Sequence, residues 1–239
     1  MHYAECIRYY APMNGKKKSV GICAYCGQTK PVTDDHVPPK NLFPKPRPSD
    51  LITVPICDEC NCGTSTDDEY FRLVVSMQFR AAQHPDAQRV LSAVYRSLER
   101  PEARGLRIAF LNRVREVSLI SRLGLYVGKT GVYEVDHPRL ERVAERIVRG
   151  LFFHHTGEPV PSTCGVKAWC FEGRTLPDEM KQVLGDIVGG LQGSKSHELG
   201  NRTFRYKFSF VEESDEHPHS SAWVFSVYEA VDFLVLIVD

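Results

Sequence analysis

The stretch that decides the fold of the first part of this chain runs from residue 23 to residue 61. It reads CAYCGQTKPVTDDHVPPKNLFPKPRPSDLITVPICDECN. Two C-x-x-C pairs enclose it, and they supply four thiolates: Cys23, Cys26, Cys57 and Cys60. Four thiolates can close a tetrahedral zinc site. A redox-active pair is the competing interpretation, but two pairs that flank a turn-rich insert of 30 residues favour zinc.

The insert between the two pairs is poor in segments that could build a core. Five prolines lie between Pro38 and Pro48, which leaves room only for short strands and loops. One short strand is expected to end in the segment TDDHVPPK, and a second one, Ile52 to Ile56, leads into Cys57. A region with so little core needs a staple, and a bound metal ion would serve as one.

The order of these features resembles the HNH endonuclease family in its four-cysteine form: C-x-x-C, then DH-x-x-P, then a strand that ends in C-x-x-CN. The resemblance covers roughly residues 20–70. It implies a ββα-metal (treble-clef-like) fold, with the Asp-His pair at the end of the first strand and the final Asn on the helix opposite. It also implies metal-dependent hydrolysis of phosphodiester bonds in nucleic acid.

Carried over to this sequence, the resemblance assigns a role to each residue of the motif. Asp35 and Asn61 would be the protein ligands of a catalytic divalent ion such as Mg²⁺, and His36 would be the general base that activates water. An imidazole with an ordinary pKa near 6.5 can accept a proton at neutral pH. Adjacent residues of a strand point to opposite faces, so Asp35 and His36 meet only if the backbone bends, and the prolines that follow make a bend plausible.

The sequence departs from the family at the middle position of the motif. The Asn that usually orients the base is missing before the second cysteine pair, and Asp50 stands there instead, with Asn41 as the other candidate. A carboxylate can orient a histidine as well as an amide can. Two alternatives stay open: a catalytically inactive zinc-binding adaptor, and an RNase toxin that uses the same site.

The rest of the chain predicts an α+β protein without internal repeats. We expect an HNH module at residues 1–70 and an accessory α+β region at 71–239, helical over 71–155 and mixed over 156–239. Apolar periodicity predicts helices that begin near Ser65 and span 86–98, 137–153 and 177–191. Alternation predicts strands at 203–211 and within 222–238, which would form a C-terminal antiparallel sheet. The segment 106–135 is ambiguous, with strand-like pieces at 123–127 and 132–135.

Charge is distributed unevenly along a chain whose net charge is zero. Residues 71–150 hold 15 Lys and Arg against eight Asp and Glu. Arg pairs well with phosphate, so this region predicts a nucleic-acid surface, with DNA preferred and four candidate contacts: Arg107, Arg113, Arg115 and Arg122. A solvated helix face, or a surface for a protein partner or a second subunit through 71–239, is the alternative.

No stretch is apolar and long enough to span a bilayer, and residues 1–10 lack the apolar core of a signal peptide. We therefore expect a cytoplasmic protein with no membrane partner. The large region without a sequence-reading motif favours a role in restriction or antiphage defence.

Other polar groups carry weaker signals. The pairs His154-His155 and His217-x-His219 could bind metal, but they lack nearby acidic or thiol ligands and read as ordinary histidines. Asp67, Asp68 and Glu69 could reach the catalytic ion, but a capped helix start explains them more simply. Lys16, Lys17 and Lys18 could touch phosphate or form a basic loop. Four cysteines outside the pairs read as buried thiols: Cys6, Cys62, Cys164 and Cys170.

Overall fold

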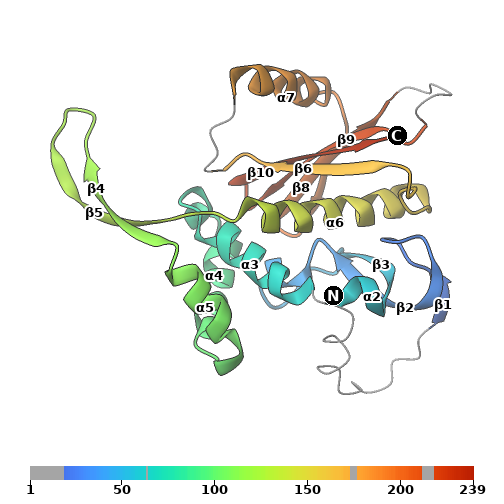
Figure 1. Cartoon of the computed structure of the whole chain (residues 1–239), viewed down its shortest axis with the longest axis horizontal. Helices are drawn as coiled ribbons and strands as arrows, with labels where there is room; N and C mark the ends of the chain where they lie inside the picture. Colours follow the sequence, from blue (N-terminus) through green and yellow to red (C-terminus); the bar gives the residue numbers. More distant parts are fainter. Residues whose placement is uncertain (1–18, 63, 173–176, 212–217) are drawn as a thin grey trace.

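The computed structural model describes residues 19–62, 64–172, 177–211 and 218–239. Helices and antiparallel sheets are both present, which confirms the α+β class and the C-terminal antiparallel sheet (Figure 1). In chain order the strands are β1 (Ser19–Ile22), β2 (Thr29–Val37), β3 (Ile52–Cys57), β4 (Val114–Ile120), β5 (Tyr126–Tyr133), β6 (Gly165–Cys170), β7 (His197–Leu199), β8 (Phe204–Phe210), β9 (Ser221–Val227) and β10 (Val231–Val238). The α-helices are α2 (Asp58–Asn61), α3 (Thr64–Met77), α4 (Pro85–Leu98), α5 (Arg104–Leu111), α6 (His137–Thr156) and α7 (Asp178–Gly190). Short 3₁₀ turns lie at Lys40–Leu42, Arg80–Gln83 and Pro101–Ala103.

The first part of the chain is a small antiparallel sheet in the order β1-β2-β3, followed by α2 and α3. Strands β2 and β3 pair without a register shift from Val32 opposite Cys57 to Val37 opposite Ile52. One face of this hairpin is apolar and buried, with side chains from both strands: Val37, Ile52, Val54 and Ile56.

The second sheet has the order β6-β10-β9-β8-β7, and every pair in it is antiparallel. Figure 1 shows α6 along one side of this sheet and α7 on the other. Helix α6 also packs on the first sheet. Its Gly150 lies so close to Val37 that an added Cβ would meet the valine side chain at 2.5 Å. The absence of a side chain at Gly150 therefore lets α6 pack closely against the first sheet while its other side covers the second sheet.

A single cluster of buried apolar side chains runs from Cys23 near the first sheet to Ile237 in β10. The hydroxyl of Tyr228, which is fully buried, donates a 2.6 Å hydrogen bond to the carbonyl oxygen of Leu42. The expectation of a core-poor N-terminal region was therefore wrong, because α3, α6 and the C-terminal hairpin supply the missing apolar surface. The boundary expected at residue 70 falls inside α3.

Several predicted elements are present at nearly the predicted bounds, among them α4, α6, α7 and strands β8 to β10. The ambiguous segment contains α5 and a two-stranded sheet, β4 with β5, so the region 71–155 is not wholly helical. This hairpin, residues 114–133, is called the arm here, and Figure 1 shows it projecting away from the rest of the chain. Among the described residues, no helix is both long and apolar enough to cross a membrane.

Candidate metal centre

The four cysteines of the two C-x-x-C pairs come together in space. One ligand atom from each of Cys23, Cys26, Cys57 and Cys60 lies within 4.8 Å of all the others. The sulfurs of Cys26 and Cys57 are 3.9 Å apart. A tetrahedral zinc ion with Zn–S bonds of about 2.3 Å needs sulfurs about 3.8 Å apart. The cluster therefore fits a metal ion such as zinc, as the spacing predicted.

Two knuckles present these sulfurs. The first is the turn between β1 and β2, where the amide of Gly27 donates to the carbonyl of Cys23 at 2.9 Å and Gly27 adopts a φ of 71°. A positive φ is easy for glycine and costly for most other residues, which explains a glycine directly after Cys26. The second knuckle joins β3 to α2, with Cys57 ending the strand and Cys60 inside the helix.

Backbone donors at the cluster favour the thiolate form of Cys23. Burial opposes ionisation of Cys23, but the amides of Cys57, Cys26 and Tyr25 outweigh it and lower the pKa of Cys23 to about 7. The amide of Cys57 lies 3.4 Å from the Cys23 sulfur. Burial and the neighbouring thiols raise the pKa of Cys60 instead. Four thiolates this close repel one another, and a cation in their midst would remove the repulsion.

A second polar centre lies beside the knuckles and is built around Asp35. The hydroxyl of Tyr25, in the first knuckle, donates a 3.2 Å hydrogen bond to Oδ2 of Asp35 in β2. Burial and the charge of Asp35 both raise the pKa of Tyr25, so the phenol stays protonated and remains a donor. The first C-x-x-C turn thus fixes the orientation of the Asp35 carboxylate.

Asp68 of α3 belongs to the same centre and forms an ion pair with Arg146 of α6. Burial raises the pKa of Asp68 to about 6, against the attraction of Arg146, and the negative charge of Asp35 adds to the increase. The helix dipole is the simplest explanation of the acidic start of α3. The structure adds a reason that no local pattern contains, because Asp68 and Arg146 are 78 residues apart.

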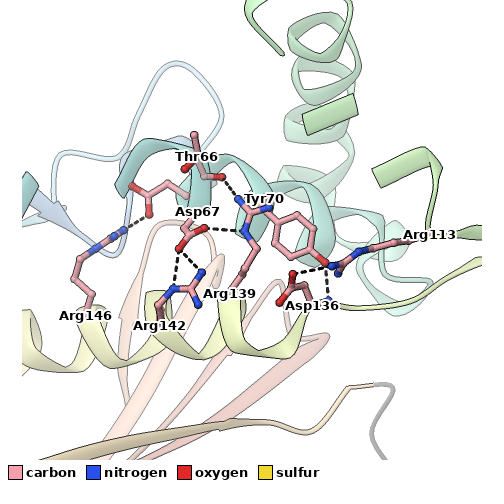
Figure 2. A network of polar contacts seen from close by, with 9 residues as sticks. Thr66, Asp67, Tyr70, Arg113, Asp136, Arg139, Arg142 and Arg146 are labelled. Atoms are coloured by element: carbon pink, nitrogen blue, oxygen red, sulfur yellow. Dashed lines mark hydrogen bonds and ion pairs between the residues drawn. The ribbon is translucent and has the colours of Figure 1, made fainter. Parts of the chain in front are cut away.

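Figure 2 shows the wider network that joins α3 to α6. Asp67 accepts a 2.7 Å hydrogen bond from Arg139 and pairs with Arg142 at 2.9 Å. Arg139 also lies over the ring of Tyr70, 4.3 Å from its centroid. Part of the positive charge in residues 71–150 therefore balances the acidic residues of α3. That part is not free to bind phosphate.

His36 and Asp35 do not meet. Because β2 is regular through Val37, Asp35 shares a face with its partner Val54, and His36 shares the other face with Thr53. The bend expected from the prolines comes after the pair. Burial, followed by the charge of Lys40, lowers the pKa of His36, and its Nδ1 is buried without a hydrogen-bond partner.

The two candidates for the middle position of the motif lie in different places. Asn41 donates to the carbonyl of Asp68 at 3.4 Å, and its Oδ1 is buried without a partner, so it sits near the Asp35 centre. Asp50 is exposed, and among the described residues His36 Nδ1 donates no hydrogen bond to it. Asn61 ends α2, directly after Cys60, and its carbonyl accepts a 3.0 Å hydrogen bond from the Thr64 hydroxyl.

Asp50 lines a cavity of about 470 Å³ at the edges of the two sheets, together with Thr53, His154, His197 and Glu198. His154 and His155 end α6, as expected of helix-end histidines, and the ring centroids of His155 and His197 lie 5.1 Å apart. No local sequence pattern predicts that His197 lies close to His154 and His155. Among the described residues, these histidines belong to no group of three or more side chains that could hold a metal ion.

The remaining candidates have varied positions. Cys164 and Cys170 are buried thiols, as predicted. Cys62 is half-buried and disulfide-bonded, so the prediction of a buried free thiol was wrong at this position. Arg113 pairs with Asp136 at 2.9 Å, and Arg107 donates to the carbonyl of Leu98, while Arg115 and Arg122 stand exposed on the arm. The predictions that concern Cys6, His217 and Lys16 to Lys18 fall outside the described residues.

Tyr25 and Arg146 are residues of this centre that no sequence motif marks. Asp68 is a candidate for reaching the catalytic ion, but its place in an acidic helix start has a simpler explanation. The aromatic residue inside a C-x-x-C turn also has a simpler explanation when it is read alone. When the chain is compared with known proteins, no family model, no curated sequence and no solved structure matches it.

Proposed function

We propose that this chain is a metal-dependent endonuclease of the HNH type that hydrolyses phosphodiester bonds in nucleic acid, preferably DNA. The observation that carries the proposal is the Asp35-His36 pair on β2, which the hydrogen bond from Tyr25 to Asp35 links to a four-cysteine cluster that joins the β1–β2 turn, β3 and α2. The order of strands, knuckles and helix is the one that the sequence resemblance implies. The four cysteines bind structural zinc, which leaves no open position for chemistry.

Asp35 would hold a catalytic divalent ion such as Mg²⁺, with Asn61 as the second protein ligand. Carboxylate and amide oxygens suit such an ion, and the hydrogen bond from Tyr25 keeps the Asp35 carboxylate in one orientation. Once bound, the ion would offset negative charge that builds up on the phosphate during hydrolysis. Asp68 adds negative charge nearby, and its ion pair with Arg146 offsets part of that charge.

His36 would be the general base. Because burial lowers its pKa, its imidazole is neutral at pH 7 and can accept a proton from water. The unpartnered Nδ1 leaves this ring without the hydrogen bond that orients most catalytic histidines. Asp50 and Asn41 remain the two candidates for that orienting role.

A zinc-binding adaptor without catalysis is the second candidate function. The specific observation in its favour is that Asp35 and His36 lie on opposite faces of β2, so the proposed metal ligand and the proposed base do not face one substrate in this conformation. Substrate binding would have to bend β2 at Asp35 for the nuclease proposal to hold.

One assay decides between these functions. The purified full-length chain is incubated with plasmid DNA, single-stranded DNA and RNA, each with Mg²⁺, with Mn²⁺ and with EDTA. We expect cleavage of DNA that EDTA abolishes, and a loss of about 10² to 10⁴ in rate for His36→Ala. His219→Ala, in a loop near the C-terminus, is the matched control and should keep full activity. Cleavage of RNA alone would favour the RNase alternative. Absence of cleavage of all three substrates with zinc still bound would favour the adaptor.

A further inference from the structure

The arm, residues 114–133, is held firmly at its base. Before β4, the guanidinium of Arg113 donates to Asp136, which follows β5, and the amide of Asp136 donates to the Tyr70 hydroxyl at 2.8 Å (Figure 2). The ring of Tyr133 lies 5.2 Å from that of Phe110, and its hydroxyl accepts a hydrogen bond from Gln78. Both strands of the arm are therefore held at their base by contacts with α3 and α5.

Beyond its base, the arm exposes large apolar side chains. Along the strands these are Val117, Leu119 and Val132, and toward the tip they are Ile120, Leu123, Leu125, Tyr126 and Val127, with Leu123 87% exposed. Helix α5, next to the base, adds Ile108 and Leu111, which are 46% and 58% exposed. An isolated two-stranded sheet is at best marginally stable in water. A patch of this kind on a soluble domain marks an interaction surface.

The distribution of side chains on the arm favours protein over nucleic acid as its partner. The register places Arg115, Val117 and Leu119 on the same face as Val132, while Glu116 and Lys129 lie on the other face and pair with each other at 2.6 Å. Only Arg115 and Arg122 then remain as exposed cations among many apolar groups. A β-ribbon that binds a DNA groove relies on polar and cationic side chains for its contacts.

The placement of the apolar groups fits a second copy of the same chain. In a two-fold dimer, residue i of one copy contacts residue j of the other, and j contacts i. This arm offers two apolar sites, one at its tip and one at α5 beside its base, separated by the length of its strands. These ten exposed apolar residues at roughly 100 Å² each offer on the order of 1,000 Å², and a stable interface needs about 800 Å² from each partner.

We propose that two copies of this chain exchange arms, so that the tip of each arm, around Leu123 and Leu125, covers Ile108 and Leu111 of the partner. The faces that carry Val117, Leu119 and Val132 pack against each other between these ends. The dimer has two identical tip-to-base contacts. This inference is independent of the proposed nuclease function, because it is tested by mass and not by activity.

The test is sedimentation equilibrium of the full-length chain between about 1 and 100 µM, compared with arm variants. The parent should have twice the monomer mass of 27.1 kDa. Leu123→Asp with Leu125→Asp, and separately Leu111→Asp, should each weaken dimerisation by at least about 100-fold, because each change acts at both symmetric contacts. Val20→Asp and Phe79→Asp, at exposed apolar positions elsewhere, are matched controls and should remain dimeric. Unchanged zinc content and circular dichroism show that the variants are folded.

A photo-crosslinking residue at position 123 tests the exchange directly, since it should attach to α5 of the partner. A parent that is monomeric up to 100 µM overturns the proposal, as does a dimer that survives in all arm variants. Crosslinks from position 123 that reach only its own chain also overturn it. So does a monomeric parent whose arm variants lose only nucleic-acid affinity, which would assign the arm to nucleic acid.

Discussion

Tyr25 and Asp35 are joined by a 3.2 Å hydrogen bond from the phenol to the carboxylate, and this contact links the first metal-binding knuckle to β2. Tyr25 stands between two cysteines of the cluster, and Asp35 stands next to His36. Whatever positions the cysteines therefore also positions the acidic residue. A metal ion in the cluster would act on Asp35 without touching it.

Tyr25→Phe tests this link. The change leaves a half-buried carboxylate without its donor, which should cost about 1–3 kcal/mol of folding free energy, and the zinc content should be unchanged. In the nuclease assay the variant should need more Mg²⁺ for half-maximal cleavage while its maximal rate changes little. Urea denaturation and a metal titration measure the two effects. Tyr95→Phe, at an exposed position of α4, is the control. Parent-like stability in Tyr25→Phe would contradict the assigned role of the bond.

The cysteine cluster should hold one zinc ion per chain. Cys57→Ser should lose the metal, as measured by elemental analysis of purified protein. Since the β2–β3 hairpin packs on α6, we expect this variant to lose order at the knuckles and keep the C-terminal sheet, which hydrogen exchange would resolve. Cys164→Ser, at a buried thiol outside the cluster, should retain zinc. A folded parent protein that contains no metal would refute the prediction.

Arg146 and Asp68 form the least exposed ion pair between α3 and α6, with side chains 14% and 20% exposed. Arg146→Met leaves the Asp68 carboxylate without its cation, so we expect a loss of roughly 3–5 kcal/mol. Arg142→Met removes an arginine that is 57% exposed and should cost under about 1 kcal/mol. Adding Asp68→Asn to Arg146→Met should recover part of the loss, and a full double-mutant cycle measures the coupling. Equal losses of folding free energy in Arg146→Met and Arg142→Met would show that the contribution of these ion pairs does not depend on their burial.

His155 should make stability depend on pH. Burial, with the positive charges of its neighbours, lowers the pKa of His155 to about 4. Between pH 6.5 and about 4 the unfolded chain binds a proton at this histidine and the folded chain does not, so stability falls as the pH falls through this window. His155→Gln should therefore lose less stability between pH 7 and pH 5 than the parent does, as measured by urea denaturation. His154→Gln, at the exposed neighbouring position, should behave like the parent. If His155→Gln lost as much stability between pH 7 and pH 5 as the parent does, the lowered pKa of His155 would be contradicted.

Elements with a strong local pattern could be predicted from the sequence. Helix α6 and strand β8 have clear apolar periodicity, and the cysteine spacing identified the metal cluster because ligand spacing is itself local. The arm was ambiguous because neither of its faces packs on the body, so its sequence lacks the alternation that a half-buried sheet imposes. Strand β7 is only three residues long, too short for any pattern.

The centre around Asp35 could be predicted only in part. Asp35, His36 and Asn61 stand in a recognisable order, but the ion pair of Asp68 depends on a residue in α6, far along the chain. The opposite orientations of Asp35 and His36 follow from the regular pairing of β2 with β3. The prolines that suggested a bend act after Val37. Spacing indicates which residues can be neighbours, and packing decides which of them are.

The hydrogen bond from Tyr228 to Leu42 has a consequence for biosynthesis. The two residues are 186 positions apart, and a ribosome adds about 5–20 residues per second. The loop that follows the Asp35-His36 pair therefore waits about 10 to 40 seconds for its buried partner to be made. Until then Leu42 and its neighbours lack the surface on which they pack. The segment around Leu42, although translated well before Tyr228, can complete its packing only after Tyr228 has been made.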